Sequence, residues 1–333
     1  MRRSLAIVLA AALGVSLVAC GSKKAAAPEP TQSASPSPTA EPVYSPLTGE
    51  EVTTERTHPV FVVKMDNTYA SRPQVGLDKA DLVVEELVEG GLTRLALFFD
   101  SELPATVGPV RSLRTTDISL VKPVDATVVA SGAAWSTLRK LKSAGVDLWL
   151  DPGAGTSGSK HFYRVTDRRS PYNLLFSLKK FAKETDPPAR DVKPFFSFGD
   201  SDVWANAKTK KAIDAGFSAG RHTLWRYTNK GYVNTNTNAA APGLRPDTVI
   251  VIRVKEGDAG YTDPAGNPVP VTILKGGGPM VMFHQGKVVR GTWAKSDRDL
   301  PFSFTAAGAD LPVPVGRTWV ELVPVKGNGG SLR

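Results

Sequence analysis

The sequence predicts an α+β fold, with a mixed α/β N-terminal domain over residues 45–190 and a smaller, mostly antiparallel β domain over residues 195–333. Before residue 190, apolar runs of strand length alternate with two segments of helical periodicity, whereas only short strand-like runs separated by turns follow it. Asp186-Pro187-Pro188 ends the second helical segment, because the residue before a proline is disfavoured in a helix. The domain boundary is therefore expected there.

Residues 1–19 have the parts of a secretory signal. Arg2 and Arg3 precede an apolar stretch from Leu5 to Val18, which is shorter than the ~20 residues that span a bilayer. The run Leu17-Val18-Ala19-Cys20 resembles a bacterial lipobox, in which the thiol is diacylated and signal peptidase II cuts in front of it. We therefore predict a lipoprotein signal peptide over 1–19, lipid attachment at Cys20 with palmitate as an acyl chain, and an extracytoplasmic location at the cell membrane. The alternative is an ordinary thiol inside a cleaved signal.

Residues 20–44 are predicted to be a disordered linker, because alanine, proline, serine and threonine dominate and almost nothing there is large enough to bury. Cys20 is the only cysteine, so the mature protein forms no internal disulfide. Removing Arg2 and Arg3 lowers the formal charge from +9 to +7. A basic protein on the outer face of a membrane meets anionic lipid headgroups and anionic wall polymers. Nucleic acid is not an expected partner, because the basic residues are dispersed and no DNA-binding motif is present.

Four strands and two helices are expected in the N-terminal domain. The strands are Val60–Met65, Asp81–Val88, Leu92–Phe99 and Asp125–Ala130, which are β-branched or apolar runs. Gly90-Gly91 predicts a hairpin turn between the second and third strands. One helical face carries Ala134, Leu138, Leu141 and Ala144, and the other carries Leu174, Leu178, Phe181 and Ala182.

The second domain is expected to contain short strands separated by turns. These strands are Thr223–Thr228, Thr248–Val254, Met280–His284, Lys287–Trp293 and Thr318–Val323. Gly276-Gly277-Gly278 lies between strand-like runs and does not open a helix, so a turn is predicted there and not a phosphate-binding loop.

Arginines in the predicted loops of the first domain are the most distinctive chemical feature. An arginine presents a rigid fork of donors that matches a phosphate or carboxylate, and Arg111 and Arg114 follow the turn-forming Gly108-Pro109 closely enough to bind one anion. The alternative is that the arginines are solvated or paired with Asp66, Asp81, Glu85 and Glu89. The anion-binding candidates are Arg72, Arg94, Arg111, Arg114, Arg164, Arg168, Arg169 and Asn173.

Residues for covalent or metal-assisted catalysis are not evident. Lipidation of Cys20 removes the only thiol, and no nucleophile elbow is present. The histidines show no metal-ligand spacing; they are His58, His161, His222 and His284. We therefore expect no cofactor and no catalysis of the protein's own.

Long motifs across almost the whole mature chain resemble the YerB-like lipoproteins, a two-domain family of unknown function. In the first domain they are Met65-Asp66-Asn67, Arg72-Pro73-Gln74, Val88-Glu89-Gly90-Gly91, Gly108-Pro109-Val110-Arg111-Ser112 and Arg168-Arg169 through Asn173-Leu174. In the second domain they are Gly286-Lys287, Gly291-Thr292-Trp293 and Thr318-Trp319-Val320. The chain departs from the family pattern at Tyr172, where a histidine usually precedes the asparagine. The resemblance implies the two-domain organisation but no agreed activity.

The order of an acidic residue, a strand hairpin and closely spaced arginines also loosely resembles the LytR-CpsA-Psr family. Those proteins transfer wall polymers from polyprenyl-pyrophosphate carriers, with arginines on the pyrophosphate and aspartates on a divalent metal. This resemblance implies Arg111 and Arg114 on the pyrophosphate, and Asp66 or Asp81 on the metal. Two functions therefore remain open. One is a lipoprotein that binds an anionic wall polymer, lipid headgroup or envelope protein, and the other is a phosphotransferase-like enzyme acting on lipid-linked wall precursors.

Overall fold

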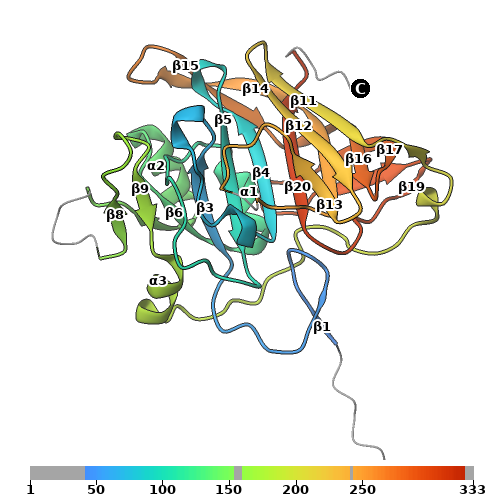
Figure 1. Cartoon of the computed structure of the whole chain (residues 1–333), viewed down its shortest axis with the longest axis horizontal. Helices are drawn as coiled ribbons and strands as arrows, with labels where there is room; N and C mark the ends of the chain where they lie inside the picture. The colour runs from blue at the N-terminus through green and yellow to red at the C-terminus, as the bar shows by residue number, and fades with distance from the viewer. Residues whose placement is uncertain (1–41, 154–159, 241–242, 327–333) are drawn as a thin grey trace, which may run out of the picture. The chain divides into compact units, whose positions relative to one another are not determined.

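One mixed sheet of 13 strands runs through the computed structural model, which describes residues 42–153, 160–240 and 243–326 (Figure 1). These residues belong to the compact unit Pro42–Arg333. The fold is α+β and mostly sheet. Cys20, the predicted signal peptide and most of the predicted linker lie outside the described residues.

The N-terminal segment contributes five strands to the large sheet. β5 (Thr93–Phe99) is antiparallel to both β3 (Phe61–Asp66) and β4 (Leu82–Leu87). β6 (Thr127–Ala130) pairs in parallel with β3, and β7 (Asp147–Leu150) pairs in parallel with β6. The four predicted strands of this segment are therefore present, with β7 added at the edge.

Helices and short hairpins complete this segment. The helices are α1 (Asp117–Val121), α2 (Trp135–Ser143) and α3 (Leu178–Thr185), with 3-10 turns η1 (Tyr69–Ser71), η2 (Leu77–Lys79), η3 (Glu89–Gly91) and η4 (Lys122–Val124). A further 3-10 turn, η5 (Asp202–Trp204), lies in the C-terminal segment. The hairpins are β1 (Val43–Tyr44) with β2 (Glu51–Val52), and β8 (Phe162–Arg164) with β9 (Leu174–Phe176). No helix among the described residues is both long enough and apolar enough to cross a membrane.

The C-terminal segment contributes the remaining strands. Those of the large sheet are β10 (Lys208–Thr209), β14 (Thr248–Thr262), β15 (Pro268–Ile273), β16 (Gly276–His284), β17 (Lys287–Lys295), β18 (Ser303–Ala306), β19 (Ala309–Asp310) and β20 (Thr318–Pro324). A separate antiparallel sheet contains β11 (Ala212–Ser218), β12 (Arg221–Thr228) and β13 (Gly231–Asn234). The large sheet follows the order β19-β18-β17-β16-β14-β20-β4-β5-β3-β6-β7.

β20 joins the two sequence segments, because it lies between β14 and β4 and is parallel to both. Every residue of Thr318–Pro324 is buried, as expected of a strand covered on both faces. The sheet is therefore continuous from the N-terminal to the C-terminal segment. The named strands of the C-terminal segment otherwise pair antiparallel to one another, so the expected mostly antiparallel arrangement is present there, and β20 is the exception.

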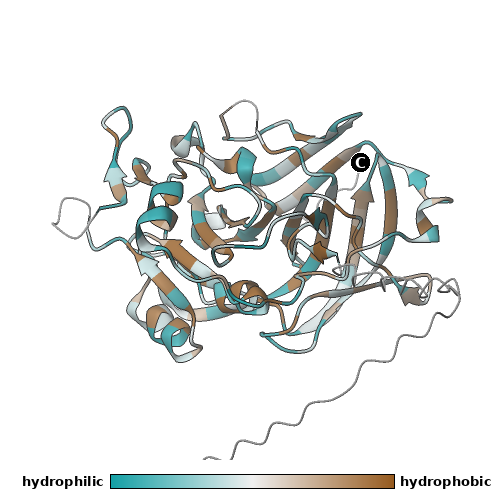
Figure 2. Ribbon diagram, turned by 90° about the horizontal axis from the view of Figure 1, so that it is seen from below, coloured by the Kyte–Doolittle hydropathy of each residue, from teal (hydrophilic) through white to brown (hydrophobic). Residues whose placement is uncertain are grey.

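Both faces of the large sheet are covered, which follows from the alternation of side chains along a strand. On one face Leu82 and Val84 of β4 pack in a core with α1, α2 and Phe195. On the other face Val83 belongs to a core shared with α3, with β8 and β9, and with the three-stranded sheet. In Figure 2 the apolar residues are concentrated on the strands between these layers.

Two local predictions are wrong. The second helix begins at Leu178, not at Leu174, because Leu174–Phe176 forms β9 and Phe176 exchanges backbone hydrogen bonds with Val107. Gly276-Gly277-Gly278 is not a turn, since it starts β16 and pairs with the end of β17. A side chain at Gly277 is excluded by the Trp293 carbonyl oxygen, 2.6 Å from where its Cβ would lie.

Candidate anion-binding site

Three of the predicted arginines line one pocket of about 620 Å³, which we call the arginine pocket. Arg94, Arg111 and Arg114 come from the N-terminal segment, whereas part of the lining comes from the far end of the β14–β15 hairpin. Its lining residues are Glu89, Arg94, Arg111, Ser112, Arg114, Ala134, Pro171, Tyr261, Thr262, Asp263, Pro264 and Val269. The two sequence segments therefore form this site together.

Backbone pairing fixes the loop that carries Arg111. The amide of Asp66 donates to the Pro109 carbonyl at 3.0 Å, and the amide of Arg111 donates to the Lys64 carbonyl at 2.9 Å. The loop thus continues beside the end of β3. Arg94 lies opposite Asp66 on the neighbouring β5. This placement gives the arginines defined positions next to one another.

Glu89 binds two of the arginines at once. The Nε atom of Arg114 donates to Glu89 Oε2 at 2.9 Å, and Nη2 of Arg114 donates to Oε1, which makes the pair bidentate. Nη2 of Arg94 donates to Oε1 of the same carboxylate at 3.4 Å. Gly90 and Gly91, with positive φ of 67° and 71°, turn the chain directly after Glu89.

Arg111 is the most accessible arginine of the three. Its side chain is 22% exposed, and its Nε atom lies 2.9 Å from Asp66 Oδ2. The Tyr172 ring centre lies 5.6 Å from the guanidinium carbon of Arg111, so the two side chains make a cation–π contact. Nε of Arg111 is buried and makes no hydrogen bond of good geometry, so its contact with Asp66 is an ion pair. Among the described residues, no hydrogen bond from Nη1 or Nη2 of Arg111 is found either. These two nitrogens remain for a ligand.

Crowding of positive charge gives the pocket its electrostatic character. Burial lowers the pKa of Arg94 to about 10, and repulsion from Arg114 and Arg111 adds to this effect. Burial opposes ionisation of Glu89, but Arg94 and Arg114 outweigh it and lower the pKa of that carboxyl. An anion bound beside Arg111 would reduce the repulsion among the guanidinium groups.

A buried lysine behind the pocket helps to position the loop. Lys64 of β3 is fully buried and lies 2.8 Å from Glu86 of β4 and 2.7 Å from Asp117 of α1. The other oxygen of Asp117 accepts a hydrogen bond from the Arg114 amide at 2.7 Å. Burial opposes the charge of Lys64, but Asp117 and Glu86 outweigh it and raise the lysine pKa. Lys64 therefore supports Arg114 through Asp117.

Helix α2 and the β14–β15 hairpin lie at the edge of the pocket. Ala134, the N-cap residue of α2, makes no side-chain capping bond and lines the pocket, so the positive end of the helix dipole faces this region. The hydroxyls of Thr137 and Tyr261 lie 3.1 Å apart and connect α2 to the hairpin. The hairpin residues were missed by the sequence analysis, because nothing local to them indicates that they pack near the arginines.

The other four candidate arginines lie outside this pocket. Arg72 donates to Asn238 Oδ1 at 2.7 Å, and Arg168 donates to the carbonyls of Ser71 and Pro73 at 3.2 and 2.9 Å. Arg164 donates to Asn173 Oδ1 at 2.9 Å, while Asn173 Nδ2 donates to the Val165 carbonyl at 3.0 Å, which ties together the β8–β9 hairpin. Arg169 is exposed. Three of the candidate arginines thus line one pocket, whereas these four and Asn173 do not.

The two candidate metal ligands are separated by β4. Asp66 adjoins Arg111, and its Oδ1 accepts hydrogen bonds from the amide and the hydroxyl of Thr68. Asp81 precedes the opposite end of β4, ~16 Å along the strand from Glu86, and accepts hydrogen bonds from Ser101 and the Asp100 amide. Within the described ranges, no cluster of three or more histidine, aspartate or glutamate side chains is arranged to hold a metal ion. The two aspartates do not form one site.

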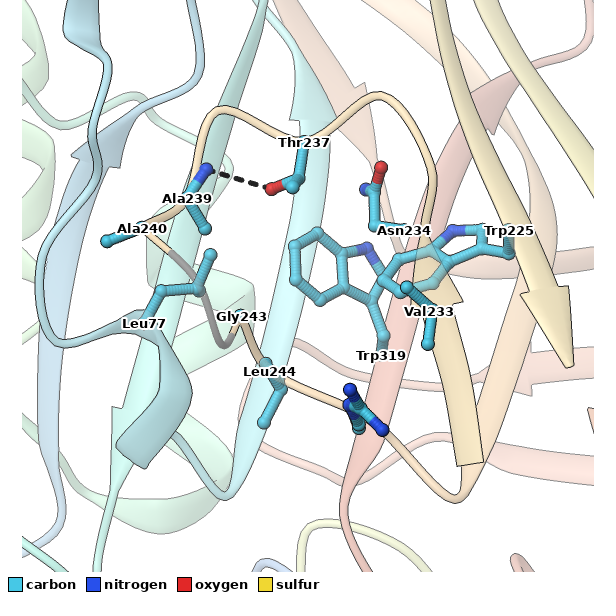
Figure 3. A pocket seen from close by; sticks show the side chains of 11 residues that line it. Leu77, Trp225, Val233, Asn234, Thr237, Ala239, Ala240, Gly243, Leu244 and Trp319 are labelled. Atoms are coloured by element: carbon cyan, nitrogen blue, oxygen red, sulfur yellow. Dashed lines mark hydrogen bonds between the residues drawn. The ribbon is translucent and has the colours of Figure 1, made fainter. Parts of the chain in front are cut away.

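A second, smaller pocket of about 200 Å³ lies beside the three-stranded sheet (Figure 3). The indoles of Trp225 and Trp319 line it, with ring centroids 4.9 Å apart. Trp225 Nε1 donates to Glu321 Oε1 at 2.7 Å beneath this lining. Glu321 of β20 is the register neighbour of Glu85 on β4, so two buried carboxyl groups adjoin there. Burial, followed by the charge of Glu85, raises the pKa of Glu321 well above its usual value.

Comparison with known proteins agrees with the motifs and the fold. Family models described as the N-terminal and C-terminal domains of "Protein of unknown function (DUF3048)" match residues 47–190 and 213–320. A Bacillus subtilis (strain 168) protein named "Putative lipoprotein YerB" is 31% identical over 304 residues, which cover 86% of this chain and 88% of that protein. The crystal structure of YerB protein from Bacillus subtilis has the same fold, with a TM-score of 0.71 at 24% identity, covering 87% of this chain and 99% of the other.

The resemblance to the YerB-like proteins, first indicated by the sequence motifs, is thereby confirmed. The two family models together match well over half of the chain. The chain belongs to the DUF3048 family of proteins of unknown function and is a relative of YerB.

Proposed function

We propose that this protein is a membrane-anchored extracytoplasmic lipoprotein that binds an anionic cell-envelope ligand in the arginine pocket and performs no catalysis of its own. The observation that carries the proposal is the convergence of Arg94, Arg111 and Arg114 on one concave pocket. The lipobox-like run ending at Cys20 and the name of the relative from Bacillus subtilis support the anchor.

The three arginines have different roles in this proposal. Arg94 and Arg114 are held by Glu89, so they supply a fixed positive field and contribute to folding. Arg111 still has two terminal donors available, and these can bind a phosphate or carboxylate bidentately. A bound anion would thus contact Arg111 directly and experience the field of the other two.

Pyrophosphate titration tests the proposal, with Arg111→Lys as the informative variant. Lysine keeps the charge but loses the rigid fork, so affinity for inorganic pyrophosphate should fall about tenfold, or ~1.4 kcal/mol. Arg169→Lys is the matched control, because Arg169 is exposed outside the pocket, and its affinity should equal that of the wild type. Calorimetric titration of the three proteins, beside thermal melting, measures both effects.

Two results would contradict the proposal. One is a wild type that binds neither pyrophosphate nor another polyanion. The other is an Arg111→Lys variant with unchanged affinity but much lower stability, which would assign Arg111 a structural role. Arg114→Lys is less informative, because its bidentate pairing with Glu89 makes a loss of stability the expected result.

The second candidate function is a phosphotransferase-like enzyme acting on polyprenyl-pyrophosphate-linked wall precursors. The observation that favours it is the position of Asp66, 2.9 Å from Arg111, where a carboxylate could bind a divalent cation next to a pyrophosphate. Adding Mg²⁺ to the pyrophosphate titration separates the two functions. Binding that requires Mg²⁺ and is lost in Asp66→Asn favours the enzyme, whereas binding independent of Mg²⁺ favours the binding protein.

A further inference from the structure

Helix α2 begins with an exposed tryptophan, Trp135, whose sequence neighbour Ala134 lines the arginine pocket. Trp135 is 72% exposed and directly follows Ala134, which lines the pocket. Large aromatic side chains are seldom left in solvent, and tryptophan is among the residues that most often dominate binding interfaces. The exposed indole of Trp135 is therefore a candidate ligand-binding residue beside the pocket.

Arg139 holds this indole in place. Its guanidinium carbon lies 4.4 Å from the centre of the Trp135 ring, one helical turn along α2. The arginine stacks on the ring, and 72% of Trp135 is still exposed. On the opposite side of the helix, Thr137 and Leu141 are buried and fix α2 to the body of the protein.

Two positively charged side chains follow the indole along the helix. Trp135, Arg139 and Lys142 are separated by four and three residues, so they lie on one face of α2, and all three are exposed. We call this face the α2 stripe. It extends ~10 Å from the pocket edge. It offers an apolar ring first and cations further along.

The combination favours one class of ligand. A sugar ring has a face of C–H groups that packs on an indole, and a carboxylate or phosphate on a sugar binds arginine and lysine. An anionic saccharide chain can place one anionic group in the pocket, one ring on Trp135 and a further anionic group beside Arg139 or Lys142. A lipid bilayer surface fits less well, because its flat face cannot place a group inside a concave pocket of about 620 Å³.

We infer that the arginine pocket and the α2 stripe form one continuous binding surface for an acidic saccharide chain, with Trp135 stacking on a sugar ring. This inference rests on the proposed function, since it names the ligand class of the same pocket. It assigns the ring contact to Trp135 and the anion contact to Arg111.

Two probes separate the ring contact from the anion contact. Inorganic pyrophosphate supplies the anion without a ring, and a galacturonate oligomer supplies both. In calorimetric titrations of the full-length protein, Trp135→Ala should weaken binding of the oligomer about tenfold and leave the affinity for pyrophosphate unchanged. Its melting temperature should not change, because the indole is exposed.

Tyr69→Ala is the matched control. Tyr69 is 77% exposed and has Arg72 stacked at 4.2 Å from its ring centre, yet it lies on η1 and does not line the pocket. Both probes should bind to this variant as they bind to the wild type. An equal loss of oligomer binding in Tyr69→Ala would overturn the assignment of the ring contact to Trp135.

The remaining outcomes distinguish failure of the saccharide inference from failure of the proposed anion site. If the wild type binds both probes and Trp135→Ala binds the oligomer normally, the saccharide inference is overturned while the anion site stands. If the wild type binds neither probe, the proposed function itself fails. If Trp135→Ala loses binding only to anionic phospholipid vesicles, the stripe contacts a membrane and the saccharide inference is wrong.

Discussion

Glu321 and Glu85 show how single residues of the sheet acquire unusual properties. Parallel pairing of β20 with β4 places their carboxyl groups side by side, and both are fully buried. Glu85 accepts hydrogen bonds from Asn67, Arg221 and Thr223, and Glu321 accepts one from Trp225. The carboxyl group of Glu85 therefore accepts hydrogen bonds from three side chains. The raised pKa of Glu321 means that this carboxyl retains its proton well above pH 4.5 in the folded protein.

Glu321→Gln should therefore change how stability depends on pH. Above pH 4.5 the folded wild type holds a proton on Glu321 that the unfolded chain releases, so its free energy of unfolding falls as pH rises, until the folded pKa is reached. Glutamine does not titrate, and it retains both a donor and an acceptor. In denaturant unfolding at pH 5 and pH 8, the free energy of unfolding of the variant should rise relative to that of the wild type by up to ~1.4 kcal/mol per pH unit inside this window. Parallel curves for the two proteins would refute the raised pKa of Glu321.

Strand β3 and helix α1 are linked by the ion triad of Lys64, Glu86 and Asp117. Because all three side chains are fully buried, their charges are compensated only by one another and by neighbouring donors. The triad connects a strand of the sheet to the start of α1, and Asp117 then holds the Arg114 amide. The triad therefore helps to fix the backbone of Arg114 beside the arginine pocket.

Lys64→Met should destabilise the protein by ~3–5 kcal/mol, because it leaves two buried carboxylates without their cation. Lys79→Met is the control, since Lys79 pairs with Glu102 at the surface and its loss should change stability little. Urea unfolding at neutral pH measures both. A similar small effect in the two variants would show that the buried triad contributes no more than a surface pair.

At the scale of the whole molecule, one sheet joins the two family domains, while the predicted anchor precedes both. β20 comes last among the strands but pairs with β4 of the N-terminal segment. The arginine pocket likewise takes part of its lining from the β14–β15 hairpin. A ligand bound there would contact residues from both segments, so binding should stabilise the whole folded unit.

Cys20→Ala tests the anchor of the whole molecule. If Cys20 carries the lipid, the variant should be released from membranes or should remain as an uncut precursor, because no other cysteine can be diacylated. Membrane fractionation of cells that express the variant, with Arg169→Lys as a control that keeps the cysteine, measures this. A variant that is still cut before residue 20 and remains fully in the membrane fraction would rule out lipid anchoring.

The sequence by itself determined the parts that depend on local pattern. Apolar and β-branched runs of strand length identified the strands that became β3, β4 and β5, and the proline pair after Asp186 marked the end of α3 at Thr185. Residue chemistry identified the arginines and the family, because motifs and the donor fork of arginine are properties of the chain alone.

Only the tertiary structure decided which of these parts meet. Arg94, Arg111 and Arg114 converge, whereas Arg72, Arg164, Arg168 and Arg169 do not, and all seven look alike in the sequence. The position of β20 and the contact of Tyr261 with Thr137 join residues far apart in the chain. Such pairings depend on burial and register over long distances, and local periodicity carries no information about them.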